Sequence, residues 1–277
     1  MFKPIVIQAL KEDIAEKDIT SAALIPKNKK AQAVIIVKQK AVLCGVSAAR
    51  LAFQALDKHV QFKTYFKDGD LVPLNSKVIS LKADARVILG AERTALNFLA
   101  HLSGVATQTH KFLEMVRPYH VKIFDTRKTL PGLRLLEKYA VRCAGGNNHR
   151  KNLNDMILIK DNHLSVLKDS SVRDIIKLAK QKKSHGVKIE VEVKNFKQYQ
   201  DAALANPDII MLDNMAVSEV RRIVKFRKDY KLHHQLEVSG NISFDNVRSY
   251  AATGVERISI GALTHSASSV DFTLKII

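Results

Sequence analysis

The stretch IIMLDNMAVSEVRRIVKFRKDYKLHHQLEVSGN, residues 209–241, decides the fold class of this chain. It begins with an apolar run at 209–212, continues with an amphipathic segment at 216–229, and ends with a second apolar run at 234–238. A strand, a helix and a second strand in this order predict two parallel strands joined by a right-handed crossover.

The same alternation extends to both sides of this stretch. The further apolar runs are VKIF at 121–124, MILI at 156–159, KIEVEV at 188–193 and RISIG at 257–261. The connecting segments at 170–183 and 243–254 have helical spacing. Six such units without a dinucleotide-binding glycine fingerprint favour a barrel or an incomplete barrel over an open doubly wound sheet.

The preceding residues indicate a mixed α and β domain. Helical spacing occurs at 4–17 and 46–58, and strand patterns occur at 31–45 and 60–66. A long helical segment follows at 91–116, and Gly104 predicts a break between two helices there. We therefore expect an N-terminal α/β domain at 1–104 and a barrel domain at 105–265.

Each predicted barrel strand is followed by polar residues or glycine. Cations follow the first two strands, acids the next two, and glycine turns the last two. In chain order these residues are Thr126, Arg127, Lys128, Lys160, Glu192, Asp213, Ser239, Gly240, Asn241 and Gly261. Loops are polar in any protein, but that alternative does not predict segregation by charge. Because the carboxyl ends of barrel strands converge on one mouth, the pattern favours a functional site there.

Arg127, Lys128, Arg150 and Lys160 form the cationic half of this predicted site. Arginine offers a planar fork to a carboxylate or phosphate, and lysine offers a compact charge. Lys160 follows four apolar residues, so it is a candidate anion clamp or a candidate Schiff-base nucleophile. His149 could orient a carboxylate, act as an acid, or be a satisfied structural histidine.

Acidic residues form the other half. Glu190 and Glu192 stand two apart on one predicted strand and so share a face, and Asp213 ends the next strand. Opposite a phosphate-bearing substrate, Glu192 and Asp213 predict ligands for Mg²⁺. Binding to ribose hydroxyls and ion pairing with the lysines are the alternatives. The glycine turns after the last two strands are typical of phosphate binding through backbone N–H groups.

Charge and composition limit the kinds of molecule that this chain is expected to bind. The formal net charge of +18 attracts polyanions, but the chain has no tryptophan and no basic tail, so we expect small anionic substrates rather than nucleic acid. Cys44 and Cys143 stand far apart in the sequence, which argues against a disulfide framework or a structural zinc site. We expect no secretory signal, no membrane span and a cytoplasmic location.

Several motifs together resemble the quinolinate phosphoribosyltransferase family. In order along the chain they are ERTALNFLAHLSGVAT, DTRKTLPGLR, EKYAVRCAGGNNHR, ILIKDNH, EVEVKN, IIMLDN, EVSGNIS and GVERISIGALTHS. The resemblance implies an N-terminal open-faced α/β sandwich, joined by the tail at 266–277, and an incomplete α/β barrel. It implies a homodimer, able to assemble further, in which Arg93 completes the partner's site.

The resemblance also implies a reaction and its residues. Quinolinate and phosphoribosyl pyrophosphate would give nicotinate mononucleotide, pyrophosphate and CO2 with Mg²⁺, in NAD biosynthesis. The implied catalytic residues are Lys128, Lys160, Glu192 and Asp213. The implied substrate-binding residues are Arg93, Thr126, Arg127, Lys128, His149, Arg150, Lys160, Glu192, Asp213, Ser239, Gly240, Asn241 and Gly261. Ala144 and Asn152 replace glycines usual in the family.

Three alternatives remain at this point. A related phosphoribosyltransferase could use another small acid in the same fold. A barrel aldolase could use Lys160 as a Schiff-base nucleophile. A basic nucleic-acid-binding module would need neither Glu192 nor Asp213.

Overall fold

The structure is a computed structural model that describes residues 2–277, and it consists of two compact units. Unit 1 contains the chain up to His110 together with Leu130–Gly145 and Ser266–Ile277, and unit 2 contains Lys111–Thr129 and Gly146–His265. The units thus differ from the predicted domains in two places. The division falls after His110 rather than at Gly104, and 130–145 groups with the N-terminal part rather than with the barrel.

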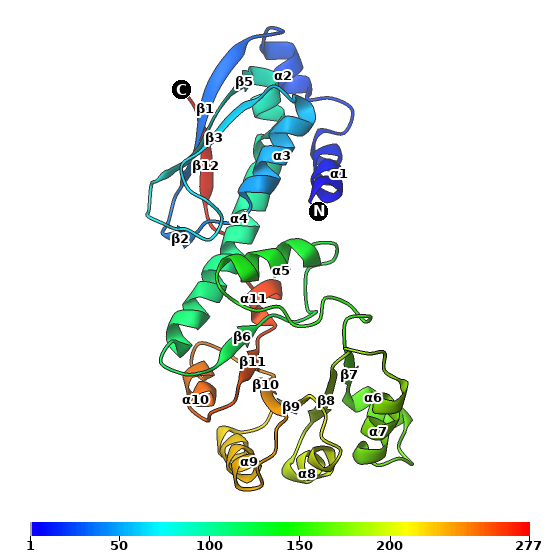
Figure 1. Cartoon of the computed structure of the whole chain (residues 1–277). Coiled ribbons are helices and arrows are strands. Elements are labelled where there is room, and N and C mark those ends of the chain that lie inside the picture. The colour runs from blue at the N-terminus through cyan, green and yellow to red at the C-terminus, as the bar shows by residue number, and fades with distance from the viewer. Residues whose placement is uncertain (1) are drawn as a thin grey trace. The chain divides into compact units, whose positions relative to one another are not determined.

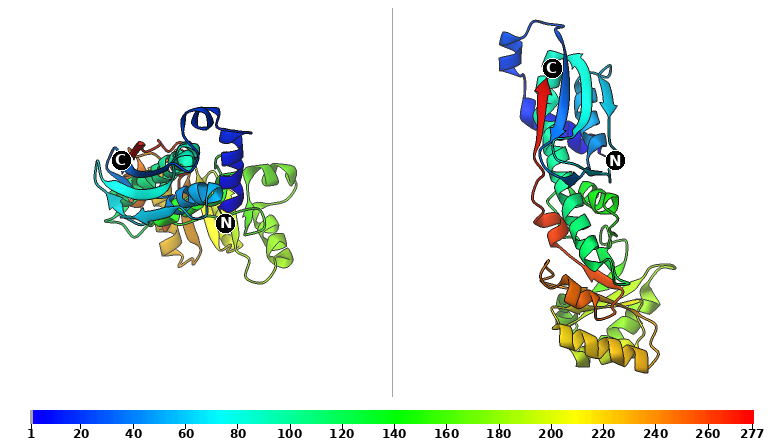
Figure 2. Two further views of the ribbon diagram at one scale, coloured as in Figure 1. Left: turned by 90° about the horizontal axis from the view of Figure 1, so that it is seen from above. Right: turned by 90° about the vertical axis from the view of Figure 1, so that its left-hand side faces the viewer.

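Unit 1 is built on a four-stranded antiparallel sheet of order β12-β1-β5-β3. Its C-terminal strand β12 lies beside β1, with Ile276 opposite Ala33 (Figures 1 and 2). The elements of unit 1 are α1 (Lys3–Ile14), α2 (Ile19–Leu24), β1 (Lys30–Val37), β2 (Ala41–Val42), α3 (Val46–Leu56), β3 (Gln61–Thr64), β4 (Leu71–Val72), β5 (Lys77–Asp84), α4 (Ala85–Val116), whose last turns enter unit 2, α5 (Arg134–Cys143) and β12 (Phe272–Ile276).

Helices and sheet share one apolar core in unit 1. Ile35 of β1 and Ile79 of β5 pack in one buried cluster with Phe53 of α3 and Leu99 of α4, all of them inaccessible to solvent. Complete burial of such side chains stabilises a fold by about 1.5–3 kcal/mol each. The sheet therefore depends on the helices that cover it.

Helix α4 runs without interruption from Ala85 to Val116, so the predicted break at Gly104 is wrong. A Cβ atom at Gly104 would come well inside van der Waals contact with the backbone carbonyl oxygen of Ser268. The glycine is needed because the C-terminal segment passes directly over the helix, and Val270 N–H donates to Ala100 O nearby. Glycine permits this close approach at a cost in helix propensity.

Unit 2 is a six-stranded parallel sheet of order β6-β11-β10-β9-β8-β7. The six predicted strands are all present, and the α/β fold with an N-terminal sheet and a parallel-strand unit is confirmed. The elements are β6 (Lys122–Phe124), β7 (Ile157–Ile159), α6 (Asp161–Val166), α7 (Val172–Lys182), β8 (Ile189–Val193), α8 (Phe196–Leu204), β9 (Ile209–Asp213), α9 (Val217–Asp229), β10 (Gln235–Ser239), α10 (Val247–Ala251), β11 (Arg257–Ser259) and α11 (Ala262–His265).

The barrel is open between its first two strands in chain order. β6 and β7 are the two edges of the sheet. Asn147 forms an isolated parallel bridge with Phe124, and its N–H donates to Ile123 O. The chain thus lays residue 147 along the free edge of β6, just before His149 and Arg150.

Among residues 2–277, no helix combines the length and the apolar character that crossing a membrane requires.

We predict that Gly104→Ala lowers the free energy of unfolding by about 1–3 kcal/mol, because the new methyl group displaces the Ser268 backbone. Gly90→Ala on the same helix is the matched control. Its Cβ would meet only Leu56 Cδ1 at 3.5 Å and Ile14 Cδ1 at 3.9 Å, so we expect a gain of up to about 1 kcal/mol. Urea unfolding of the three proteins measures both changes, and equal stability of the two variants would contradict the close-approach explanation.

Candidate active site

The carboxyl ends of the six parallel strands surround one cavity of about 840 Å³ in unit 2. The structure brings together twelve of the predicted site residues in this strand-end cavity: Thr126, Arg127, Lys128, His149, Arg150, Lys160, Glu192, Asp213, Ser239, Gly240, Asn241 and Gly261. They come from all six strand ends, as expected for a barrel mouth.

Two arginines line the cavity and give it positive charge. Arg127 follows β6, and Arg150, whose backbone and side chain are largely buried, lines the same wall. Burial, and then the nearby charge of Arg127, lower the pKa of Arg150 from its ordinary value. Two like charges facing one cavity repel each other, and an anionic group bound between them would relieve that repulsion.

The buried carboxylate of Asp125 fixes the loop that carries Arg150. Asp125 directly follows β6 and is fully buried. Its Oδ1 accepts the backbone N–H of His149 at 2.8 Å, and its Oδ2 accepts the side-chain amide of Asn148 at 2.6 Å. Hydrogen bonds to a buried carboxylate are stronger than those between neutral groups. Asp125 therefore holds the loop against the edge of β6.

His149 is held between this loop and the interior of the barrel. Its Nδ1 lies 2.8 Å from the backbone nitrogen of Arg150 and accepts that N–H when the ring is neutral. Burial disfavours the charged ring, but the carboxylates of Glu190 and Glu237 outweigh burial and raise the pKa of His149 to about 9. Nε2 faces Glu190 Oε2 at 2.9 Å and Glu237 Oε1 at 3.4 Å. Both ring nitrogens therefore face protein groups, so His149 supports the backbone of Arg150 and shapes the cavity wall.

Glu237 and Glu190 form a buried acidic pair beneath His149. Glu237 accepts hydrogen bonds from Arg257 and from the hydroxyl of Ser259. Burial opposes the charged form of Glu237, but His149, followed by Arg257 and Ser259, outweighs burial and lowers the pKa of Glu237. Burial and the Glu237 charge raise the pKa of Glu190.

The acids at the mouth also have partners. Lys160 Nζ donates to Glu192 Oε2 at 2.8 Å, which joins the ends of β7 and β8. Asp213 Oδ2 accepts from the side-chain amide of Asn214 at 2.9 Å, and Asn214 Oδ1 accepts from Asn241 at 3.0 Å. Each of these carboxylates accepts fewer hydrogen bonds than its oxygens can accept, so each keeps lone pairs for a ligand in the cavity.

Glycine turns after β10 and β11 form another part of the cavity wall. Gly240 has a φ of +93°, and a Cβ there would collide with the side chain of Asn214. At Gly261 a Cβ would lie 3.0 Å from His265 Nε2 and 3.2 Å from Lys128 Cδ. Thr264 Oγ1 also donates to Lys128 O at 2.7 Å, so the last turn anchors the cation-bearing segment.

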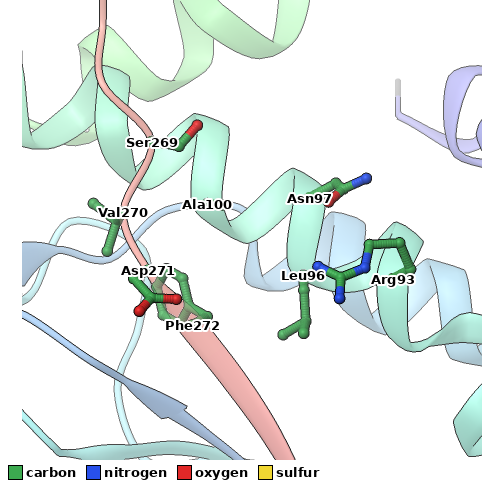
Figure 3. Close-up of a pocket in the computed structure, with 8 residues that line it drawn as sticks. All are labelled: Arg93, Leu96, Asn97, Ala100, Ser269, Val270, Asp271 and Phe272. Atoms are coloured by element: carbon green, nitrogen blue, oxygen red, sulfur yellow. The ribbon is translucent and has the colours of Figure 1, made fainter.

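The structure does not place Arg93 among these residues. Arg93 lies on α4 in unit 1 and lines a separate cavity of about 300 Å³, together with Leu96, Asn97, Ala100 and residues 269–272 (Figure 3). The two cavities share no lining residue.

Sequence reasoning missed the supporting residues Asp125, Glu237, Arg257 and Ser259. Glu237 stands two residues before Ser239 on β10, which places it on the same face of that strand. The signal that could have identified Glu237 is its position opposite Arg257 on the neighbouring strand. That position is known only when the pairing of the two strands is known. From the sequence, Asp125 could be recognised only as a polar residue at the end of a predicted strand.

Comparison with known proteins identifies the class. The description "Quinolinate phosphoribosyl transferase, C-terminal domain" matches residues 105–275, and the corresponding N-terminal domain matches residues 18–103. The chain belongs to the quinolinate phosphoribosyltransferase family, as the motifs predicted.

Relatives and solved structures agree over nearly the whole length. A probable carboxylating nicotinate-nucleotide pyrophosphorylase of Methanocaldococcus jannaschii is 40% identical, covering 99% of this chain and 96% of the relative. One of Bacillus subtilis is 38% identical, covering 96% of this chain and 90% of the relative. The structure of the nicotinate-nucleotide pyrophosphorylase from Francisella tularensis superposes with a TM-score of 0.93 at 38% identity, covering 100% of this chain and 96% of that chain.

We predict that the pH dependence of stability becomes flatter in Glu190→Gln. The folded state holds the Glu190 proton above the ordinary pKa of 4.5. The unfolding free energy therefore falls as pH rises from that value through the raised folded pKa, by at most about 1.4 kcal/mol per pH unit. The variant lacks this titration and keeps an oxygen for His149, so its stability relative to the original protein should grow across the window.

Urea unfolding at about pH 5, 6.5 and 8 measures this difference. Glu114→Gln, at an exposed position on α4, is the control and should parallel the unchanged protein. Parallel curves for Glu190→Gln as well would show that Glu190 does not bind its proton more tightly in the fold.

Proposed function

We propose that this chain transfers the phosphoribosyl group of phosphoribosyl pyrophosphate to quinolinate, with decarboxylation, in NAD biosynthesis. The products are nicotinate mononucleotide, pyrophosphate and CO2. The observation that carries this proposal is the joint lining of one cavity by two arginines, two lysines, two carboxylates and two glycine turns. Membership of the family and the names of its relatives support the same reaction.

Quinolinate carries two carboxylates, and the two arginines provide two sites for them. Arg127 and Arg150 each present a planar fork, which pairs with a carboxylate through two hydrogen bonds. His149 holds the backbone of Arg150 in place, and Thr126 Oγ1 accepts the backbone N–H of Lys128 at 3.0 Å. Fixed cations of this kind also offset the repulsion between two anionic substrates.

The phosphoribosyl group lies, in this proposal, between the lysines, the acids and the glycine turns. Ser239, Gly240, Asn241 and Gly261 offer backbone N–H groups to the 5′-phosphate. Lys128 and Lys160 lie at the mouth and face its charge. Glu192 and Asp213 accept hydrogen bonds from the ribose hydroxyls.

The same two carboxylates fit Mg²⁺. This cation prefers oxygen ligands and is often held by one or two carboxylates together with substrate phosphates. Glu192 and Asp213 supply oxygens at neighbouring strand ends, β8 and β9. The ion would stabilise the charge of the departing pyrophosphate.

The proposed chemistry uses the residues as fixed charges. The pyridine nitrogen of quinolinate bonds to the anomeric carbon as the bond to pyrophosphate breaks, and positive charge builds on the ribose ring. Glu192 and Asp213 favour that charge by proximity. The carboxylate next to the ring nitrogen then leaves as CO2, the cationic ring stabilises the electron pair left on that carbon, and a proton from solvent takes the place of the carboxylate. Since no covalent intermediate is required, Lys160 acts through its charge, in keeping with its ion pair to Glu192.

We include a homodimer in this proposal, with the partner's Arg93 completing the site. The position of Arg93 in unit 1, outside the strand-end cavity, leaves it available to another subunit. We also propose a cytoplasmic location, in keeping with the two free thiols Cys44 and Cys143.

The deciding experiment is formation of nicotinate mononucleotide from phosphoribosyl pyrophosphate and Mg²⁺, with quinolinate or nicotinate as the acceptor. We expect product from quinolinate and at least about 100-fold less from nicotinate, because nicotinate leaves one arginine without a carboxylate. Chelation of Mg²⁺ should abolish the product. Equal use of both acids would contradict the dicarboxylate site, and no product from either would contradict the proposed reaction.

The shared site predicts complementation between two inactive variants. Arg93→Ala and Lys160→Ala should each lose most activity. A mixed dimer contains one intact site, so an equal mixture that exchanges subunits should regain about a quarter of the original activity. Subunit exchange is checked by native mass spectrometry of differently labelled variants. Exchange without recovered activity would show that Arg93 does not act across the dimer.

A further inference from the structure

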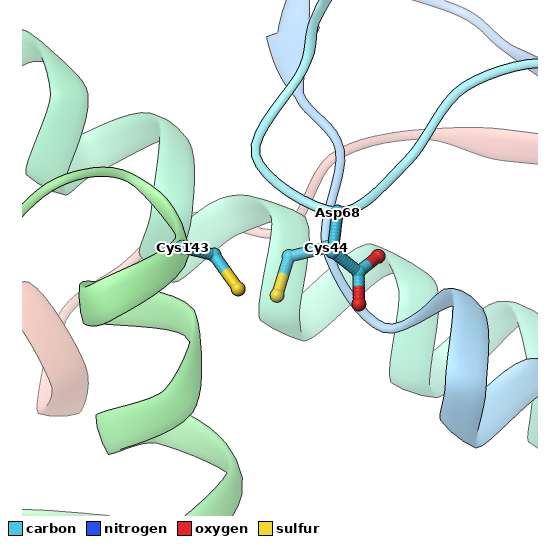
Figure 4. Close-up of side chains that lie close together, drawn as sticks. All are labelled: Cys44, Asp68 and Cys143. Atoms are coloured by element: carbon cyan, nitrogen blue, oxygen red, sulfur yellow. The ribbon is translucent and has the colours of Figure 1, made fainter.

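Unit 1 brings together the two cysteines of the chain, which are distant in the sequence. Cys44 lies between β2 and α3, and Cys143 is the last residue of α5. Their sulfur atoms and a carboxylate oxygen of Asp68 all lie within 4.8 Å of one another, and Figure 4 shows the two sulfurs side by side. Both cysteines are free thiols.

Hydrogen bonds and close packing hold the backbone around this thiol pair, Cys44 and Cys143. Ser103 Oγ accepts the N–H of Cys44 at 2.9 Å and donates to its carbonyl oxygen at 3.1 Å. On the other side, a Cβ at Gly69 would lie 2.8 Å from the carbonyl oxygen of Cys143, so the turn at 67–70 packs directly on the end of α5. The proximity of the sulfurs thus follows from fixed elements.

The two thiols are chemically unequal. Cys44 is fully buried, whereas Cys143 is partly accessible. A hydrogen bond between them, followed by burial, raises the pKa of Cys44 above its ordinary value. The same hydrogen bond lowers the pKa of Cys143. An accessible thiol of lowered pKa beside a buried thiol matches the pair of attacking and resolving cysteines in redox-sensitive proteins.

A metal ion fits this cluster less well. Structural zinc sites are closed by four ligands, mostly cysteine and histidine, and the described residues offer only three candidate ligands here. The carboxylate of Asp68 is already engaged. Its Oδ1 accepts the N–H of Val46 at 3.0 Å, and its Oδ2 accepts the hydroxyl of Tyr139 at 2.8 Å.

We propose that Cys44 and Cys143 form a reversible intramolecular disulfide when a peroxide oxidises the protein, and that this bond lowers turnover at the candidate active site. Cys143 loses its proton and attacks one oxygen of the peroxide as the thiolate, the O–O bond breaks, and a sulfenic acid forms; the hydroxide that leaves takes up the proton lost by Cys143 and becomes water. Cys44 sulfur then attacks the sulfenic sulfur, the S–O bond breaks, and hydroxide leaves with the Cys44 proton as water. Two electrons pass from the two thiols to one peroxide.

The link to activity is the chain that follows α5. Residues 144–148 lead from Cys143 to His149 and Arg150, and Asp125 holds that loop in its present position. A disulfide requires an S–S distance of about 2 Å, shorter than that between two hydrogen-bonded thiols. Bond formation therefore pulls the last turn of α5 toward residue 44 and strains the loop. This second part rests on the proposed function, whereas the thiol chemistry does not.

The thiol chemistry is tested on the full chain with stoichiometric hydrogen peroxide, followed by alkylation and digestion with trypsin without reductant. The expected product joins the peptides AVLCGVSAAR, 41–50, and CAGGNNHR, 143–150, with a mass two hydrogens below their sum. Dithiothreitol should restore two alkylated thiols. The oxidised protein should melt roughly 5 °C or more higher, because the bond closes a long loop of chain.

Cys44→Ser and Cys143→Ser are the matched variants, and each must melt close to the unchanged reduced protein. In Cys44→Ser, Cys143 should oxidise to sulfenic acid and, with a second equivalent of peroxide, to sulfinic acid, without a crosslink. In Cys143→Ser, the buried Cys44 should resist peroxide. Sulfinic acid without a crosslink in the unchanged protein would overturn the proposal, as would stoichiometric zinc that protects both thiols.

Activity is read in the same samples. We expect oxidation to lower quinolinate-dependent turnover at least about threefold, reversibly and only when both cysteines are present. A complete disulfide with unchanged turnover would overturn the regulatory part alone. If the reduced protein makes no nicotinate mononucleotide, the proposed function fails, while the mass measurement still decides the disulfide.

Discussion

The interaction on which the site depends is the pair of hydrogen bonds that Asp125 accepts from the loop at 147–150. A parallel sheet that is open between β6 and β7 leaves the edge of β6 unpaired. The chain covers that edge with Asn147, and the buried carboxylate of Asp125 holds the next two residues. Arg150 is thereby positioned at the opening of the barrel.

A second constraint is the balance of charge beneath the cavity. Cations concentrated at a barrel mouth repel one another unless acids are near. The interior supplies Glu190 and Glu237 below His149, and the mouth supplies Glu192 beside Lys160. The acids therefore hold His149 and Lys160 in place before any substrate arrives, and their hydrogen-bond partners limit the free-energy cost of burying the carboxylates.

Sequence patterns predicted the six parallel strands and most of the cavity because strand periodicity and strand ends are local features. The cation-bearing segment after β6 and Gly261 could be assigned to the cavity from their neighbouring residues in the sequence alone. The unbroken course of α4 through Gly104 was not predictable in this way, since the reason for the glycine is a carbonyl group from Ser268. The meeting of Cys44 with Cys143 was hidden for the same reason, because both depend on contacts between distant segments.

The division of the chain into units has a consequence for how such a protein can change over evolutionary time. The backbone passes between the units at 110/111, 129/130, 145/146 and 265/266. No single cut separates the units, so one crossover cannot exchange the barrel while keeping the N-terminal sheet and its last strand. An exchange of the barrel needs two crossovers, and it also replaces residues 130–145 of unit 1.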